Sequence, residues 1–208
     1  MFSLEINAQN LDTRLLQNIY GSIQPTNVSA EKFLSSTAKP LSIALPVGLL
    51  VAGFSTKNKT LQHQGWQSLG GLVIGSVVTE ATKRMVFRDR PFIAQPHFFL
   101  ARIDEDELHN SFPSGHTTVA FSTATTLAIN YRKWYVIVPA YAWAGAIGYS
   151  RMRLGVHYPS DVLAGAVTGA AGAWLSYKIQ QQWLKRMQKK KKIVNKGSSQ
   201  RLFLSTTF

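Results

Sequence analysis

The hydrophobic residues of this chain are gathered into separate segments rather than spread along one face of successive amphipathic helices. Each segment is rich in Ala, Gly, Ser and Thr, and small residues let helices approach closely, as they do in membranes. We therefore predict an all-α fold, a bundle of about five core helices that spans a membrane. The five apolar blocks cover residues 41–54, 69–79, 117–131, 134–149 and 162–177.

The lengths of the blocks leave a second possibility open. Each uncharged block is shorter than the roughly 18–20 residues of a full membrane span, and buried helices of soluble proteins have similar lengths. The mean hydropathy, −0.03, also fits a soluble helical bundle. Aromatic residues at or near block ends favour the membrane, because Trp and Tyr are enriched at membrane interfaces. These aromatic residues are Trp134, Tyr135, Tyr149, Trp174 and Tyr177.

The two ends of the chain differ from the central part. We divide the sequence into an N-terminal segment (1–40), a helical bundle (41–180) and a basic C-terminal tail (181–208). The first segment carries an apolar helical stripe that could lie along a membrane interface or pack on the bundle. The stripe consists of Leu11, Leu15, Leu16, Ile19 and Tyr20.

Charge is distributed unevenly along the 208 residues. The net charge is +13, and seven of the 23 Lys and Arg residues lie between Lys185 and Lys196. Such a tail can be a solvated, disordered end or can lie beside an anionic membrane surface. No nucleic-acid-binding motif accompanies it, so we expect no nucleic-acid partner. The absence of cysteine excludes disulfide bonds.

The first stretch with candidate chemistry follows the second apolar block. Lys83 and Arg90 are seven residues apart and Pro91 follows. We predict that both cations lie on one face of a helix that ends at or before Arg90. Two cations at such a helix end can hold phosphate oxygens, and the planar guanidinium of Arg suits them.

The second stretch, Pro113-Ser114-Gly115-His116, precedes an apolar block. Ser114 is a natural helix cap, and Gly115 lets the backbone approach a ligand closely. The free amides of a helix start bind phosphate without a cofactor. His116 could then protonate a leaving alkoxide.

The third stretch contains Arg151, His157 and Asp161. Pro159 suits the first position of a helix, which places Asp161 in the first turn. Its carboxylate can fold back towards His157, fix the tautomer of the imidazole and leave the other nitrogen free to attack phosphorus. Arg151 supplies a further phosphate-binding cation. The alternative is a helix-start carboxylate beside a loop histidine.

Together, in this order and spacing, the three stretches resemble the signature of the type-2 phosphatidic acid phosphatase superfamily. That group includes membrane lipid phosphatases, soluble acid phosphatases and vanadium haloperoxidases. The resemblance covers roughly residues 40–180 and implies a helical bundle without a metal or other cofactor. It implies His157 as nucleophile, Asp161 as its orienting partner and His116 as general acid. It also implies phosphate binding by Lys83, Arg90, Ser114, Gly115 and Arg151.

The resemblance leaves the substrate open. We expect a membrane phosphatase that acts on a lipid phosphate or diphosphate, with membrane lipids around it. The alternatives are a soluble periplasmic acid phosphatase, a vanadate-dependent oxidant enzyme and a non-enzymatic membrane protein. An acidic run at residues 104–107 follows the first stretch and reads as a solvated loop or a lid. Oligomeric state has no signal in the sequence.

The basic residues between the apolar blocks predict the orientation of the protein in the membrane. If the three stretches share one face of the bundle, Lys57, Lys59, Arg132, Lys133 and the basic tail fall on the other. By the positive-inside tendency that other face is cytoplasmic. We therefore expect a multi-pass protein of a bacterial-type inner membrane whose site faces the periplasm or exterior. This orientation also puts residues 1–40 outside, which calls for a preceding span or a cleaved signal, and no signal-like apolar core lies near Met1.

Overall fold

The computed structural model describes residues 2–21, 28–103 and 109–205, with side chains described for 11–21, 28–103 and 109–190. Throughout these ranges the regular structure is helical, which confirms the predicted all-α class. The helices are α1 (Phe2–Gly21), α2 (Ser29–Ser55), α3 (Lys59–Val86), α4 (Pro91–Ala94), α5 (Gly115–Tyr131), α6 (Trp134–Arg153) and α7 (Pro159–Ser205).

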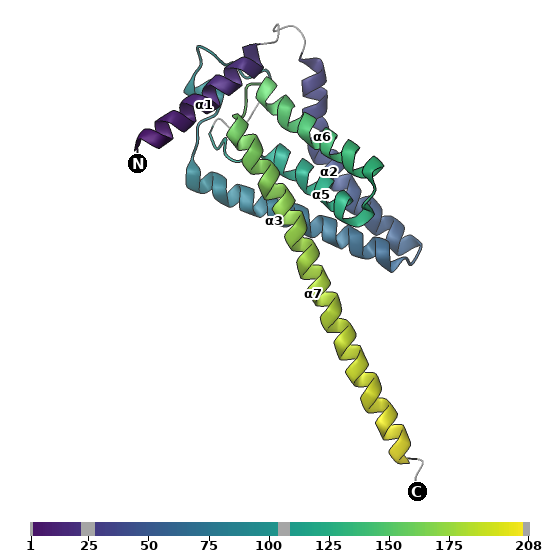
Figure 1. Ribbon diagram of the computed structural model, residues 1–208. Helices are drawn as coiled ribbons and strands as arrows, with labels where there is room; N and C mark the ends of the chain where they lie inside the picture. The colour runs from purple at the N-terminus through teal and green to yellow at the C-terminus, as the bar shows by residue number, and fades with distance from the viewer. Residues whose placement is uncertain (1, 22–27, 104–108, 206–208) are drawn as a thin grey trace.

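Five of these helices form the bundle, as predicted. α5 packs against α2, α3, α6 and α7, and α3 also packs against α2 and α7 (Figure 1). α5 is therefore the central helix, and the others surround it. α1 crosses one end of the bundle, where it contacts α6 and α7.

Local sequence signals set the ends of the bundle helices. The Asn58 side chain accepts hydrogen bonds from the backbone amides of Thr60 and Leu61, at 2.9 and 3.3 Å, and so caps α3. Phe87 has a left-handed backbone (φ 46°) that ends α3 at Val86. α7 begins at Pro159, as predicted, because proline suits the first helical turn.

Glycine allows α7 to lie against α5 and α3 without intervening side chains. A Cβ atom added to Gly165 would lie 2.6 Å from the carbonyl oxygen of Ser114 on α5. One added to Gly172 would lie 2.9 Å from the backbone nitrogen of Gly75 on α3. These approaches require the absence of a side chain, and they fix the start of α7 beside the start of α5.

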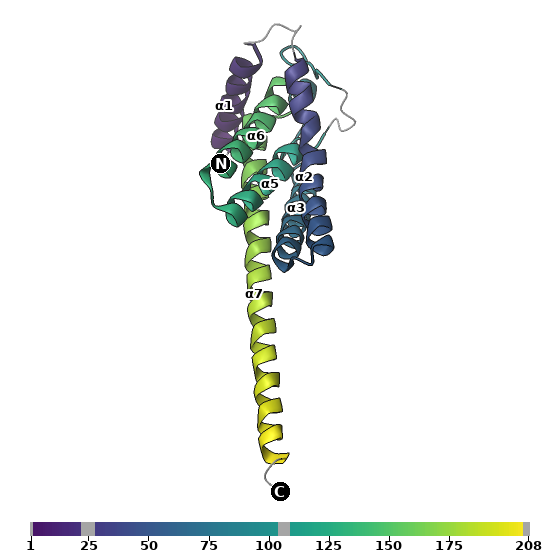
Figure 2. The same cartoon turned by 90° about the vertical axis from the view of Figure 1, so that its right-hand side faces the viewer.

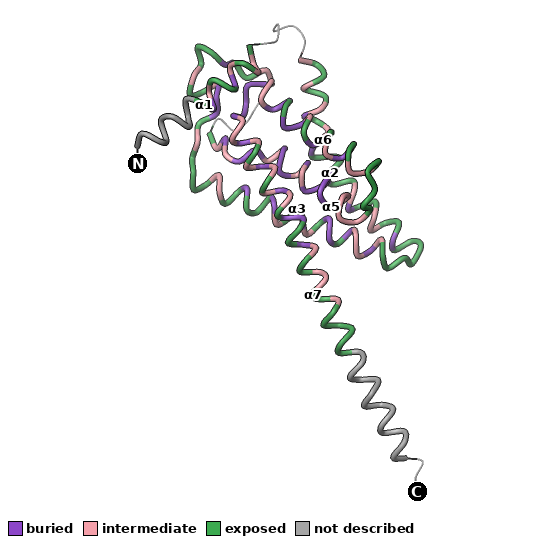
Figure 3. The backbone as a smooth tube through the Cα atoms, in the orientation of Figure 1, coloured by how far each residue is buried: buried purple, intermediate pink, exposed green. Residues whose placement is uncertain are grey.

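The interior of the bundle is small and often polar, whereas its outside is apolar. Thr117, Thr118 and Ser122 of α5 are buried. Large apolar side chains are exposed on α2, α3 and α7. Figure 3 shows exposed positions along these helices. Water-soluble bundles have the opposite distribution, since large apolar side chains fill their cores. The exposed residues include Val47, Val51, Phe54, Val73, Val77, Leu163, Val167 and Trp174.

Length and composition single out one described helix as a candidate membrane span. α2 contains an 18-residue window with a mean hydropathy of 1.5. Within the described ranges, no other helix meets the same criterion. The other bundle helices, like α2, contain many small residues, which allow helices to pack closely.

The predicted N-terminal helix is present as α1, and its apolar stripe has two environments. Leu16 is fully buried and packs with Phe99 and Tyr158. The Tyr20 ring contacts the Phe99 ring edge to face, with centroids 5.3 Å apart. Leu11 and Leu15 are exposed. One side of α1 therefore covers the end of the bundle.

Helices run through both predicted domain boundaries. α2 spans the boundary at residues 40 and 41, and α7 continues past residue 180 to Ser205 (Figure 2). The basic tail up to Ser205 is thus a helical extension that projects from the bundle. The division into three parts stays a prediction.

Candidate active site

The three stretches identified in the sequence meet at one end of the bundle. The backbone amide of Ser114 donates to the carbonyl of Asp161 at 3.0 Å, joining the second stretch to the third. The amide of Ser111, two residues before the second stretch, donates to the carbonyl of Arg88 in the first stretch at 2.8 Å. Helix packing thus assembles residues that are far apart in the sequence.

His157 and Asp161 form a buried pair. His157 is 2% exposed and Asp161 is 0% exposed. Nδ1 of His157 lies 3.6 Å from Oδ2 of Asp161 and 3.4 Å from Oγ of Ser111. Ser111 in turn donates to Oδ2 of Asp161 at 2.5 Å. Since Nδ1 faces these oxygens, the arrangement favours the tautomer with the proton on Nδ1 and the lone pair on Nε2.

The loop before the pair turns sharply. Gly155 has φ +76°, a conformation that side chains disfavour. A Cβ atom there would also lie 2.7 Å from the carbonyl oxygen of Leu100. This turn takes the chain from the end of α6 to His157, and Asp161 follows in the first turn of α7.

Burial keeps His157 neutral at ordinary pH. It lowers the pKa of the imidazole to about 4, the Asp161 carboxylate acts in the opposite direction, and Arg151 and Arg90 lower the pKa further. A neutral imidazole has a free lone pair, which a nucleophile requires. The Asp161 carboxylate lies where it would stabilise a positive charge on the ring.

Two buried arginines accompany the pair. Arg90 and Arg151 are each 2% exposed. Nη1 of Arg90 donates to the carbonyl of Val156 at 3.4 Å, beside His157. Nη1 of Arg151 donates to Oγ of Ser35 on α2 at 2.9 Å. Buried cations of this kind strongly favour an anionic ligand.

The predicted geometry of the first stretch is wrong in one respect. Because α3 ends at Val86, Lys83 lies in its last turn, whereas Arg90 follows the break and precedes α4. The two cations therefore do not share one helix face. The prediction that the helix ends before Arg90 is confirmed. Lys83 is half-buried, and its binding of phosphate stays a prediction.

The second stretch supplies the start of α5. Ser114 precedes the helix as predicted, but its side chain makes no capping bond to a backbone amide. Its Oγ instead accepts from the Thr117 hydroxyl at 3.0 Å. A Cβ atom added to Gly115 would meet nothing within 4 Å, so open space lies above the helix start. Backbone amides at the start of a helix can bind an anionic ligand, and this space leaves room for one.

His116 faces the other site residues. It interacts electrostatically with Arg151, Lys39, His157 and Arg90. The imidazole is half-buried, so it borders both the cations and the open side of the site. That His116 donates a proton to a leaving oxygen stays a prediction.

Several residues of the site carried no signal in the sequence. Ser111 and Arg88 contact Asp161 directly, yet neither occupies a signature position. Ser35 and Lys39 come from α2, which the sequence did not connect with the site. Only the packing of α2 against α5 and α6 brings them there. The acidic run at 104–107 lies outside the described residues.

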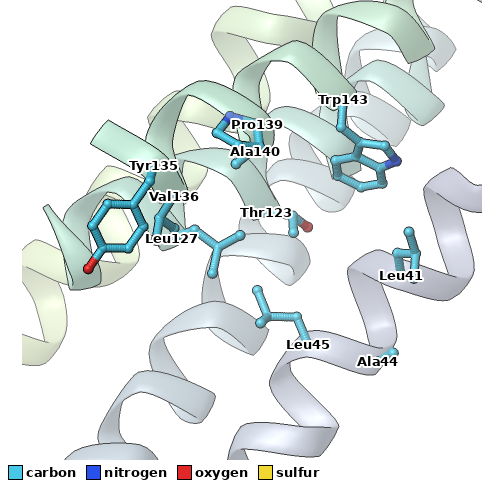
Figure 4. Close-up of a pocket in the computed structure, with 10 residues that line it drawn as sticks. All are labelled: Leu41, Ala44, Leu45, Thr123, Leu127, Tyr135, Val136, Pro139, Ala140 and Trp143. Atoms are coloured by element: carbon cyan, nitrogen blue, oxygen red, sulfur yellow. The ribbon is translucent and has the colours of Figure 1, made fainter. Parts of the chain in front are cut away.

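An apolar groove opens on the side of the bundle below the site. It has a volume of about 580 Å³, with α2 on one side and α5 and α6 on the other (Figure 4). Thr123 of α5 lines it, seven residues after His116, or about 10 Å along the helix. The remaining lining includes Leu41, Leu45, Leu127, Val136 and Trp143.

Comparison with known proteins agrees with this geometry. The chain is 37% identical over 87 residues to the lipid A 4'-phosphatase of Bacteroides thetaiotaomicron, across 42% of this chain and 39% of that protein. It is 35% identical over 109 residues to the undecaprenyl-diphosphatase of Sulfolobus acidocaldarius, across 52% and 51%. The chain therefore spans about half or less of the length of these relatives.

Solved structures share the fold. The crystal structure of Aquifex aeolicus LpxE superposes with a TM-score of 0.65 at 25% identity, covering 79% of this chain and 93% of that one. The family model described as the PAP2 superfamily matches residues 64–185, which contain all three stretches. The chain belongs to the PAP2 superfamily, as its motifs predicted.

Proposed function

We propose that this protein is a metal-independent phosphatase that hydrolyses a lipid phosphate or diphosphate through a phosphohistidine intermediate. The observation that carries the proposal is the buried pair of His157 and Asp161 beside two buried arginines, Arg90 and Arg151. A neutral, oriented imidazole facing fixed positive charge is what in-line attack on a phosphate requires.

In the first step Nε2 of His157 attacks phosphorus. The N–P bond forms as the bond from phosphorus to the leaving oxygen breaks, and that oxygen takes a proton from His116. The product alcohol, or a lipid monophosphate when the substrate is a diphosphate, departs. Asp161 stabilises the positive imidazole of the phosphohistidine.

In the second step water attacks the phosphohistidine. Neutral His116 takes a proton from the water as its oxygen bonds to phosphorus and the N–P bond breaks. Inorganic phosphate leaves, His157 is again neutral, and His116 has recovered its proton. No oxidant, reductant or cofactor is consumed.

The protein's own groups supply the positive charge. Arg90, Arg151 and the amides at the start of α5 neutralise the non-transferring oxygens, and Lys83 adds to them. Fixed donors of this kind stabilise the transition state without reorganising. We therefore expect turnover without a divalent cation.

The lipid nature of the substrate rests on the outer surface of the bundle. Large apolar side chains cover it, and exposed apolar surface of this extent marks contact with lipid. The apolar groove begins about 10 Å from His116 along α5 and can take the first part of a lipid chain. The names of the two relatives, a lipid A 4'-phosphatase and an undecaprenyl-diphosphatase, agree with this class of substrate.

The intermediate is tested with radiolabelled substrate. Acid-labile label should accumulate on wild-type protein quenched during turnover, and His157→Ala should carry none and show no turnover. His97→Ala, which alters an exposed histidine, is the matched control and should behave as wild type. Rapid turnover by folded His157→Ala would refute the nucleophile. Activity lost in EDTA and restored by magnesium would refute metal independence.

The runner-up is a soluble periplasmic acid phosphatase of the same superfamily. The short apolar blocks and the near-neutral mean hydropathy favour it. Fractionation separates the two: a lipid phosphatase of the membrane requires detergent for extraction, whereas the soluble enzyme does not.

A further inference from the structure

Arg88 bridges the Asp161 carboxylate to a second carboxylate on the N-terminal helix. Its Nη1 donates to Oδ1 of Asp161 at 2.8 Å, and its Nη2 donates to Oδ2 of Asp12 at 2.6 Å. The guanidinium also lies over the Tyr158 ring, 4.0 Å from its centroid. The guanidinium of Arg88 thus links α1 to Asp161, whose carboxylate faces His157.

Asp12 is held in turn by the start of α7. Its Oδ1 accepts from the backbone amide of Ser160 at 2.9 Å, and its Oδ2 accepts from the Ser160 hydroxyl at 2.5 Å. Nη1 of Arg88 completes the set with a bond of 2.6 Å to the same hydroxyl. The Asp12 carboxylate therefore accepts a hydrogen bond from one of the first backbone amides of α7, which have no partner within the helix.

These contacts decide how the Asp161 carboxylate is oriented. Oδ2 receives the amide of Tyr158 at 2.8 Å and the hydroxyl of Ser111 at 2.5 Å, and it faces His157. Oδ1 is held by Arg88. Without Arg88, the orientation of the carboxylate would rest on the two hydrogen bonds to Oδ2 alone.

We propose that Arg88 and Asp12 are positioning residues, which hold Asp161 in the orientation that directs His157 and so make catalysis depend on the docking of α1. This inference rests on the proposed function, because it concerns the same catalytic pair. Neither residue is expected to touch the phosphate.

A simple surface ion pair does not account for this arrangement. The side chains of Arg88, Asp12 and Asp161 are 21%, 10% and 0% exposed. The pair of Arg84 and Glu80 on α3 shows the contrast, with side chains 75% and 53% exposed. Exposed pairs of that kind contribute little, whereas a buried carboxylate that loses its cation is costly.

The electrostatic surroundings of His157 make the proposal testable without a substrate. The charged and titratable groups that act on its ring are Asp161 from α7, Arg151 from α6, Arg90 from the loop before α4 and His116 from α5. Arg88 acts through Asp161, since its charge offsets part of the field of that carboxylate. Removing the cation should raise the pKa of His157, and removing the Asp12 charge should lower it.

The experiment follows the ring titration of His157 by NMR on histidine-labelled full-length protein in detergent, assigned with His157→Ala. The variants are Arg88→Gln, Arg88→Lys, Asp12→Asn and the double variant Asp12→Asn/Arg88→Gln. Arg84→Gln is the matched control, because it removes an arginine of an exposed pair in the same segment. Activity on a lipid phosphate and the melting temperature are measured in parallel.

Arg88→Gln should raise the titration midpoint by about 0.5–1 pH unit, and Asp12→Asn should lower it by less. Arg88→Lys keeps the charge but cannot fork onto two carboxylates, so its midpoint should stay near that of wild type. Both Arg88 variants should lose about 10–100-fold in kcat with little change in KM, as happens when an orienting partner is removed. The double variant should lose no more than Arg88→Gln alone.

The two proposals can fail separately. If wild type is active and the midpoint does not move in Arg88→Gln or Asp12→Asn, the positioning role is wrong and the phosphatase assignment stands. If the midpoints move in opposite directions but wild type hydrolyses no lipid phosphate, the coupling stands and the proposed function is wrong. If Arg88→Gln does not fold, the midpoint of Asp12→Asn and the kcat of Arg88→Lys decide instead: an unshifted midpoint with a wild-type kcat would refute the positioning role.

Discussion

The backbone amide of Ser114 donates a 3.0 Å hydrogen bond to the backbone carbonyl of Asp161. This bond fixes the start of α5, which offers free amides to a phosphate, beside the start of α7, which carries the partner of His157. Gly165 makes the approach possible, because any side chain there would collide with the carbonyl of Ser114. Two signature stretches are thereby held together by main-chain contacts alone.

Gly115→Ala should impair phosphate binding while leaving the fold intact. A Cβ atom at Gly115 meets no protein atom within 4 Å, so the added methyl group would point into the space proposed for the phosphate. We expect KM to rise about 10-fold or more, with an unchanged melting temperature. Gly145→Ala is the control, since its Cβ also meets nothing within 4 Å but lies on an exposed face of α6. Equal kinetics in the two variants would contradict the proposed phosphate position.

His116→Ala should lose most activity on substrates with poor leaving groups. A general acid matters most when the departing oxygen is strongly basic, and removing one costs about 10²–10⁴-fold. An alkyl phosphate should therefore suffer far more than p-nitrophenyl phosphate. Asp161→Asn should damage both similarly, because His157 must be oriented whichever group leaves. Equal losses on both substrates in His116→Ala would make His116 a phosphate-binding residue instead.

Filling the apolar groove should affect lipid substrates selectively. Ala44 of α2 lines the groove and is exposed, so Ala44→Trp places a large ring where a lipid chain would lie. We expect kcat/KM to fall about 10-fold on a long-chain lipid phosphate and to stay unchanged on p-nitrophenyl phosphate. Ala52→Trp, at an exposed position of α2 outside the groove lining, is the control. A lipid substrate unaffected by Ala44→Trp would mean that its chain lies elsewhere.

Sidedness can be measured with single cysteines, because the chain has none of its own. His97 is exposed in the segment that follows α4, and Lys133 is exposed in the connection between α5 and α6. If the site faces outward, His97→Cys should react with an impermeant thiol reagent in intact cells. Lys133→Cys should react only after the cells are lysed. The reverse pattern would invert the proposed orientation.

Part of the candidate site could be predicted because its signals are local. Proline at position 159 favours a helix start, and this places Asp161 in the first turn of α7, four residues after His157. Ser114 likewise precedes α5 as its residue type predicts, although its side chain makes no capping bond. Such features depend on residues only a few positions apart, so the sequence contains them in full.

The first stretch shows where local reasoning fails. The seven-residue spacing of Lys83 and Arg90 fits one helix, yet Phe87 adopts a left-handed conformation and ends α3 at Val86. After this break the chain changes direction, so Arg90 donates to the carbonyl of Val156 and Arg88 donates to the carboxylate of Asp161. Those tertiary bonds favour the break over a continuous helix.

By itself, then, the sequence determined the all-α class, the five apolar helices, the identity of the signature residues and the start of α7. The helices and the start of α7 follow from composition, periodicity or capping over a short span, whereas the signature residues were identified by resemblance to the superfamily's motifs. Only the tertiary structure decided that Ser111 and Arg88 contact Asp161, that Asp12 contacts Arg88 and that Ser35 contacts Arg151. Their partners lie 50 to 116 residues away. Contacts over such separations arise from how whole helices pack, and packing depends on surfaces that no local pattern specifies.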